Sequence, residues 1–256
     1  MLFDTHCHLS HPALNSRLPE VLAEAATQDV RRFLAPATGA EDWAAVVALG
    51  SAQIDIALGI HPWFVDGQPA DALDKLAQHL HAHPQALVGE IGLDFHPNRR
   101  HNAIDQSACF EAQLQLAQSL QRPIVLHNLK ADAACLAGIR RCGFTQGGFA
   151  HAFSGSLESA QAWLKLGFKI GIGSVLLNPK AVKIRHLVAQ LSLVDMVLET
   201  DAPFMPPQNS ATAYNHPRHT LAIAQAVADI QGVALAEVAT QTTHNALCML
   251  HPKTTA

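Results

Sequence analysis

The sequence predicts a single (β/α)8 barrel, the TIM-barrel form of the α/β class, over residues 1–256. The chain length is close to the roughly 250 residues that one such barrel needs. Short apolar runs alternate with stretches of helical spacing along the whole chain, which indicates parallel strands joined by helical crossovers. There are eight such runs, and eight strands close a barrel.

The predicted strands are apolar runs that mostly end in a polar residue. The first begins at Leu2 and Phe3 and leads into His6 and His8. The others are Arg32–Pro36, Ile54–Ile60, Ala86–Asp94, Pro123–His127, Gly147–His151, Phe168–Ile172 and Met196–Asp201. An open doubly wound sheet is the alternative, but it would normally show a glycine-rich phosphate turn after the first strand, and this sequence has none.

The predicted helices place apolar residues three and four positions apart, as Leu18, Val21, Leu22 and Ala25 do. They are Arg17–Gln28, Glu41–Ser51, Asp71–His83, Ala103–Leu120, Asp132–Arg141, Leu157–Leu166, Pro179–Leu191, Arg218–Gln231 and Leu235–Leu250.

Composition excludes several classes of protein. Apolar residues make up 49% of the chain and charged residues 15%, which is typical of a compact enzyme and not of a disordered chain. The five cysteines include no Cys-x-x-Cys pair, which favours free thiols in a reducing compartment. We find no secretion signal or membrane-length apolar run, so we expect a cytoplasmic protein. The formal charge of −4 and the lack of any Lys/Arg run longer than two argue against a basic face for long duplexes.

Polar residues close most of the apolar runs, at the barrel end where function gathers. They are His6, His8, His61, Glu90, His127, His151 and Asp201. His6 and His8 would share one face of a strand, although two ordinary half-buried histidines would give the same pattern. Four of the imidazoles and the two carboxylates together offer nitrogen and oxygen ligands for one or two divalent ions. This nitrogen-rich set suits Zn, Mn, Fe or Ni better than Mg.

Two carboxylates in this set are candidate catalytic residues. Glu90, close to Gly89 and Gly92, would bridge two ions, which can hold a hydroxide between them and stabilise the attacking and leaving oxygens. Asp201 would bind one ion and accept the proton of the attacking water. Glu199 would share the face of Asp201 and could support a ligand from behind.

The remaining polar residues have weaker signals. His61 would either contact a substrate phosphate or cap the turn at Pro62 and Trp63. Lys130 is the obvious phosphate partner, Asp94 would hold the following loop, and Cys7 would point away from the two histidines.

Five segments together resemble the TatD family of metal-dependent hydrolases and deoxyribonucleases. They are Asp4-Thr-His-Cys-His8, Gly59-Ile-His-Pro-Trp63, Gly89-Glu-Ile-Gly-Leu-Asp94, His151-Ala-Phe-Ser-Gly155 and Leu198-Glu-Thr-Asp-Ala-Pro203. The resemblance covers the chain in order. It implies an amidohydrolase-type barrel with a two-metal site that cleaves DNA phosphodiesters, commonly from a 3′ end. By position, the implied metal ligands are His6, His8, bridging Glu90, His127, His151 and Asp201.

Three positions depart from the usual family pattern. Ser10 stands where an acidic residue is common, Leu129 where an arginine is usual, and His216, between Asn215 and Pro217, where a glutamate is usual. The substrate-facing surroundings therefore differ from those of the family's best-known nucleases.

These observations predict a metal-dependent phosphodiesterase or deoxyribonuclease acting on DNA 3′ ends, short single strands or small phosphoesters. A hydrolase of amide, lactone or carboxylic ester bonds is the alternative, and a non-enzymatic metal-binding protein the third. Related barrels often bridge their metals with a carboxylated lysine. No lysine ends a predicted strand here, so Glu90 favours the phosphodiesterase. We expect a monomer that needs no membrane and no obligate protein partner.

Overall fold

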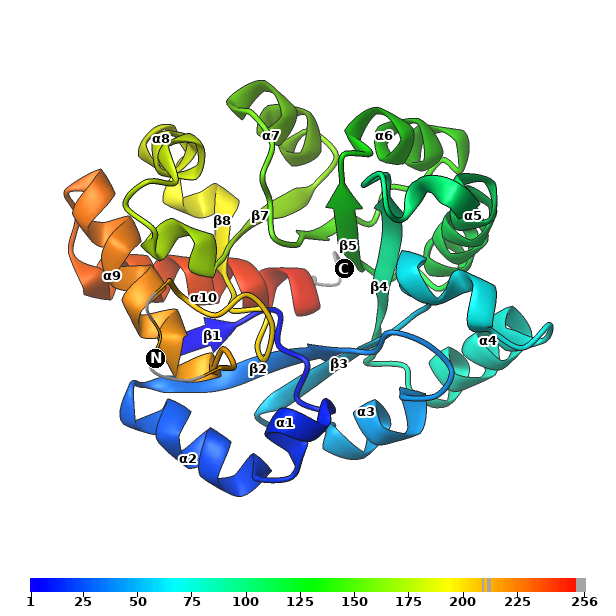
Figure 1. The fold of residues 1–256 in the computed structure, drawn as a ribbon, viewed down its shortest axis with the longest axis horizontal. Helices are drawn as coiled ribbons and strands as arrows, with labels where there is room; N and C mark the ends of the chain where they lie inside the picture. Colours follow the sequence, from blue (N-terminus) through cyan, green and yellow to red (C-terminus); the bar gives the residue numbers. More distant parts are fainter. Residues whose placement is uncertain (209, 211–212, 252–256) are drawn as a thin grey trace, which may run out of the picture.

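The computed structural model describes residues 1–208, 210 and 213–251 and has an eight-stranded sheet at its centre. All seven strand pairs are parallel and follow the chain order, and helices surround the strands in Figure 1. The strands are β1 (Leu2–Asp4), β2 (Val30–Pro36), β3 (Ile54–Leu58), β4 (Leu87–Asp94), β5 (Ile124–Leu129), β6 (Gly148–Ala150), β7 (Phe168–Ile172) and β8 (Met196–Leu198). The predicted (β/α)8 barrel is confirmed.

The barrel closes between β1 and β8, mainly through the residues that follow these strands. Thr5 N donates to Leu198 O at 2.9 Å, Asp201 N to His6 O at 2.9 Å, and His8 N to Ala202 O at 2.7 Å. We call this junction the seam. It matters for function because His6, His8 and Asp201, three predicted ligands, are themselves the residues that close it.

The helices form a layer around the strands, with most of the buried apolar side chains between the two. They are α1 (Pro12–Asn15), α2 (Leu18–Thr27), α3 (Trp43–Leu49), α4 (Ala72–Ala82), α5 (Ala103–Ser119), α6 (Asp132–Arg141), α7 (Leu157–Leu164), α8 (Val182–Gln190), α9 (Thr220–Gln231) and α10 (Leu235–Leu250). Short 3-10 turns are η1 (Pro62–Gly67), η2 (Arg100–Asn102), η3 (Ser174–Leu177), η4 (Leu193–Asp195) and η5 (Pro217–His219).

A second apolar cluster fills the barrel interior, so the barrel is a packed core with no channel. Seven strands each contribute one buried side chain, and α10 covers the cluster with Ala246. The strand residues are Phe3, Leu34, Ala57, Leu87, Val125, Phe149 and Val197.

Among the described residues, no single helix is long and apolar enough to cross a membrane. Pro217–Gln231 and Leu235–Leu250 reach that length and hydropathy only as a pair bent by 114°.

Most predicted element bounds agree with the structure to within three residues, but two polar strand ends lie outside the sheet. β8 was expected to reach Asp201 but ends at Leu198, because Asp201 has a φ of 60°, which interrupts an extended strand. β6 likewise ends before His151, and Ala152 just beyond it has a φ of 44°. Both side chains are therefore held by loop hydrogen bonds as well as by the sheet.

Candidate metal centre

The interior packing explains why predicted site residues share one end of the barrel. Val125 and Phe149 point into the barrel, and side chains two residues further along a strand lie on the same face. His127 and His151 therefore follow them toward the carboxyl end, as Glu199 follows Val197. The same period of two links His61 to the interior residue Ala57. His6 and Glu90 depart from it, because they lie three residues after Phe3 and Leu87, on strands whose pairing shifts register.

His6 and His8 follow β1 and are placed by the buried carboxylate of Asp4. Its Oδ1 accepts hydrogen bonds from His6 N at 3.3 Å and Thr200 N at 3.0 Å, and its Oδ2 accepts one from Thr200 Oγ1 at 2.6 Å. Asp4 thus holds the two sides of the seam together beneath the histidines. Cys7 between them is fully buried, with Sγ toward Leu34 O at 3.9 Å, as predicted.

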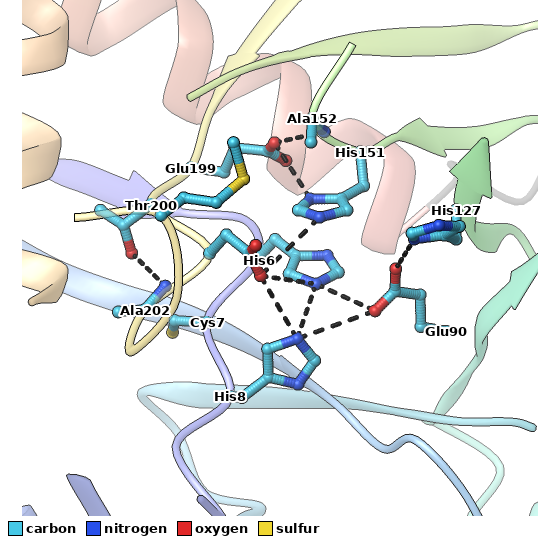
Figure 2. Close-up of polar contacts among 12 residues, drawn as sticks. His6, Cys7, His8, Glu90, His127, His151, Ala152, Glu199, Thr200 and Ala202 are labelled. Atoms are coloured by element: carbon cyan, nitrogen blue, oxygen red, sulfur yellow. Dashed lines mark hydrogen bonds and ion pairs between the residues drawn. The ribbon is translucent and has the colours of Figure 1, made fainter. Parts of the chain in front are cut away.

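Four predicted ligands form a first group of donor atoms, which we call the seam group. His6 Nε2 and His8 Nε2 are 3.2 Å apart, and both face Glu90 Oε2, at 3.2 Å and 3.7 Å (Figure 2). Asp201 Oδ1 is 3.7 Å from His6 Nε2 and 3.4 Å from His8 Nε2. Adjacent ligands of one ion with bonds of about 2.0–2.2 Å stand roughly 3–3.6 Å apart. The seam group therefore has the spacing of atoms that share an ion.

The other oxygen of Glu90 faces a second group. Oε1 lies 3.0 Å from His127 Nδ1 and 3.6 Å from His61 Nε2, and these two nitrogens are 3.1 Å apart. We call His61 and His127 the β5-side group. One carboxylate thus faces two sets of nitrogen donors, one with each oxygen.

The structure places His151 with the seam group. Its ring stacks on that of His6, with centroids 3.4 Å apart, and its Nε2 is 3.8 Å from Asp201 Oδ1. From behind, Glu199 Oε1 lies 3.0 Å from His151 Nδ1 and accepts a hydrogen bond from Ala152 N at 2.6 Å (Figure 2). The suggested support of a ligand by Glu199 is therefore a direct contact with His151.

Glycines near the two buried glutamates make room for neighbouring atoms. A Cβ on Gly171 would lie 2.5 Å from Glu199 Oε2, so this glycine leaves space for the carboxylate. A Cβ on Gly92 would lie 1.8 Å from His127 O. Gly92, two residues after Glu90, thus allows β5 to approach β4 closely.

His61 and Asp94 both take part in holding the β5-side group. His61 Nδ1 accepts a hydrogen bond from Trp63 N at 3.1 Å, so the residue caps η1 while its Nε2 faces Glu90. Asp94 Oδ2 accepts from Trp63 Nε1 at 2.5 Å and lies 3.4 Å from His127 Nε2. His61 thus caps the turn and Asp94 holds the loop, as expected. The same contacts also orient the Nε2 atom of His61 and the ring of His127.

The electrostatics of the cluster favour a bound cation. Burial opposes ionisation of Glu90, but His6 and His61 outweigh it and hold the pKa of Glu90 well below its usual value. Burial alone would lower the pKa of His151, yet the carboxylates of Glu199 and Asp201 raise it to about 10. The same carboxylates that favour a proton on His151 would favour a metal ion. Buried imidazoles and carboxylates with converging atoms therefore fit one or two divalent ions.

All the donors except His6 line a cavity of about 980 Å³. Lys180 and Lys183 are the lysines or arginines lining it among the described residues, and Lys183 Nζ donates to Ser154 O. Lys130 is exposed, has a φ of 55° and is not part of the lining. These two lysines thus come from the loop before α8 and from the first turn of α8, within the segment predicted as the helix Pro179–Leu191.

The three departures from the family pattern lie in different surroundings. Ser10 and Leu129 line the cavity, whereas His216 does not. His216 Nδ1 accepts from Arg218 N at 3.0 Å and caps η5, while Nε2 is 3.4 Å from Glu24 Oε2. The third departure therefore concerns the contact of η5 with α2, away from the substrate.

Comparisons with known proteins identify the family. Residues 3–251 match the family model described as TatD related DNase. A relative from Escherichia coli K12, "Uncharacterized metal-dependent hydrolase YjjV", is 33% identical over 241 residues, 92% of each chain. The crystal structure of its YJJV protein has a TM-score of 0.90 at 32% identity and covers 97% of each chain. A Pantoea sp. At-9b protein named "3'-5' ssDNA/RNA exonuclease TatD" is 33% identical over 196 residues, 73% of this chain and 74% of its own.

Proposed function

Because this chain belongs to the TatD family of metal-dependent hydrolases, we propose that it is a two-metal phosphodiesterase. Its substrates would be DNA 3′ ends, short single strands or small phosphoesters. The related protein from Pantoea, which is named an exonuclease, supports a phosphodiester as the bond that is cleaved.

The observation that carries the proposal is the position of Glu90. Its Oε2 faces the seam group and its Oε1 faces the β5-side group, and the side chain is 2% exposed. A carboxylate with one oxygen toward each of two donor sets is suited to bridge two ions. Related barrels often bridge their metals with a carboxylated lysine, so a glutamate there favours phosphoester chemistry.

The protein residues have separable roles in this proposal. The seam group with His151 would hold one ion, and His127 with Glu90 the other. Bound ions would supply a nucleophile at neutral pH and stabilise charge on the phosphate oxygens. Asp201 would accept a proton at a carboxylate oxygen. His151 and the hydrogen bond from His8 outweigh burial and keep the pKa of Asp201 below its usual value, so the carboxylate is ionised. Glu199 and Asp94 orient His151 and His127.

We propose that the chain acts as a monomer over residues 1–256 without an obligate partner. Every residue of both donor groups comes from one chain, and the cavity is lined by the same chain.

The test is a substrate screen with metal-loaded and chelated protein. Short oligothymidylates, small phosphodiesters, mononucleotides, lactones and N-acyl compounds would be compared, with Asp201→Asn as the matched inactive variant. We expect phosphodiester hydrolysis that chelation abolishes and added metal restores. Turnover of lactones or amides without phosphodiester turnover would select the alternative, and full activity after exhaustive chelation would refute the role of metal.

A further inference from the structure

Three exposed aromatic side chains line the cavity beside the metal centre. One of them, Phe64, contacts His61, with ring centroids 5.9 Å apart. The other two are Phe204 and Trp63. Phe204 is 46% exposed and Trp63 is 43% exposed, and both line the cavity. The ring of Phe204 lies 5.4 Å from that of His8, and the ring of Trp63 lies 6.1 Å from that of His127, between centroids. Each aromatic thus contacts a candidate metal ligand, and the two ligands belong to different donor groups.

Both aromatic rings are held in place by protein contacts. Trp63 donates its indole hydrogen to Asp94 Oδ2 at 2.5 Å, and the guanidinium of Arg99 lies 4.5 Å from the centroid of its ring. Phe204 N donates to Asp201 O at 2.7 Å, and its ring also contacts His11, with centroids 5.3 Å apart. Rings fixed in this way lose little freedom when a ligand stacks on them, which favours affinity.

The contacts run from one aromatic to the other through the bridging carboxylate. Phe204 contacts His8, His8 faces Glu90 Oε2, Glu90 Oε1 faces His127, and His127 contacts Trp63. A phosphodiester has two substituents, and one bound to ions at Glu90 would have one substituent available to each end of this path. The aromatic rings are therefore placed to meet the two groups that flank the scissile phosphate.

We propose that Phe204 and Trp63 are stacking platforms for the two nucleobases on either side of the scissile phosphate. This inference rests on the proposed phosphodiesterase function and adds the residues that would bind the bases of an unpaired oligonucleotide, without base preference. Every base has a π-face, so stacking on aromatic side chains tolerates all sequences. Bases within a duplex have both faces covered by their neighbours, so the platforms would select single strands and frayed ends.

The scarcity of positive charge is consistent with this mode of binding. Lys180 and Lys183 are the lysines or arginines in the cavity lining within the described part of the chain. Duplex-binding proteins draw much of their affinity from neutralised phosphates. Here base stacking would supply that affinity instead, because it does not depend on a basic surface.

The fluorescence of Trp63 gives a direct binding readout. The chain has three tryptophans, of which Trp43 and Trp163 are buried, at 2% and 0% exposed. We would titrate Zn²⁺-loaded protein with a thymidine trinucleotide and, separately, with an abasic trinucleotide of equal charge, both with hydrolysis-resistant phosphorothioate links. We expect the thymidine oligomer to quench Trp63 and to bind at least about 5-fold more tightly than the abasic one, since one stacked base contributes about 5- to 150-fold.

Substitutions of Phe204 then test whether its aromatic ring is responsible for the preference for the thymidine oligomer. Phe204→Ala should lower the thymidine-to-abasic affinity ratio by about 5-fold or more, and Phe204→Trp should restore it. Phe204→Leu keeps apolar bulk, and should also lower the ratio if the aromatic face matters. Val182→Ala is the matched control, because Val182 also lines the cavity and is 71% exposed but offers no π-face. Using the ratio cancels any general loosening of His8, since both oligomers carry the same phosphates.

The outcomes separate this inference from the proposed function. A wild-type ratio near one, or equal effects of Phe204→Ala and Val182→Ala, would overturn the stacking inference. Hydrolysis of unmodified abasic and thymidine oligomers at similar efficiency would also overturn it, while leaving the phosphodiesterase intact. Base-dependent binding with no hydrolysis of either unmodified oligomer would support the platforms and refute the proposed activity.

Discussion

Glu199→Gln tests whether a residue behind the metal centre sets its affinity for metal. Glu199 is 1% exposed, its Oε1 is 3.0 Å from His151 Nδ1, and Gly171 leaves space for the carboxylate. Glutamine keeps the shape but replaces a charge-assisted hydrogen bond of about 1.5–3 kcal/mol with a neutral one of about 0.5–1.5 kcal/mol. The difference of about 1–2 kcal/mol predicts metal binding about 5- to 30-fold weaker. Glu199→Ala removes the acceptor that faces His151 Nδ1, and should weaken metal binding about 10- to 100-fold.

The assay is competition for Zn²⁺ against a fluorescent chelator at fixed pH, with thermal melts of the metal-free proteins as a folding check. Glu158→Gln is the matched control, because it removes an exposed carboxylate from nearby α7. Metal affinities of both Glu199 variants within twofold of wild type, in folded protein, would refute the idea that Glu199 orients His151 for metal.

Further predictions concern the bridge, the proton acceptor, the cavity cations and pH. Glu90→Gln should leave fewer than two ions per chain by elemental analysis and lower turnover at least about 100-fold, or about 2.7 kcal/mol; two retained ions would refute the bridge. Asp201→Asn, whose side chain is only 14% exposed, should lower turnover by a similar factor but change the melting temperature little, whereas a collapsed melt with residual activity would mark it as structural. Lys183→Gln should reduce the magnitude of the salt slope of oligonucleotide binding by about 0.7, the value for one phosphate contact on a single strand, and Lys130→Gln should leave it unchanged. Burial, with the charge of Arg218, lowers the pKa of His216 to about 4. Folding stability should therefore fall as the pH drops from about 6.5 to 4, by up to about 3 kcal/mol. The variant His216→Asn should lack this pH-dependent loss of stability in thermal melts across the same range.

The fold was predictable because its periodic signals are strong. α10 (Leu235–Leu250) and β7 (Phe168–Ile172) have the predicted bounds, since apolar spacing continues to their ends. The 3-10 turns η3 and η4 were missed, because such short turns carry no repeat, whereas the start of η1 was predicted as the turn at Pro62 and Trp63. The end of β8 was misplaced because nothing in Leu198–Asp201 reveals that Asp201 adopts a left-handed conformation.

The candidate site was predictable in its membership but not in its pairings. A polar residue after an apolar run marks His127 and His151, since interior positions recur every second residue. That His151 joins the seam group and His61 joins His127 depends on distances between loops, which one sequence does not encode locally. Lys180 and Lys183 line the cavity from the start of the predicted helix Pro179–Leu191. Apolar spacing predicts such a helix but does not show that its first residues face the cavity, and Lys130 was selected instead.

The seam also determines when the centre can exist during synthesis. Asp4 and Thr200, whose hydrogen bonds join its two sides, are 196 residues apart in the chain. A ribosome makes the histidines of the seam group first and Asp201 only after all eight strands, so a nascent chain carries an incomplete donor set for most of its translation. Since domains generally fold as units, the complete donor set would be presented only by a chain whose last strand has docked. Metal loading would then follow folding, and the ion acquired would reflect what is available to the finished barrel.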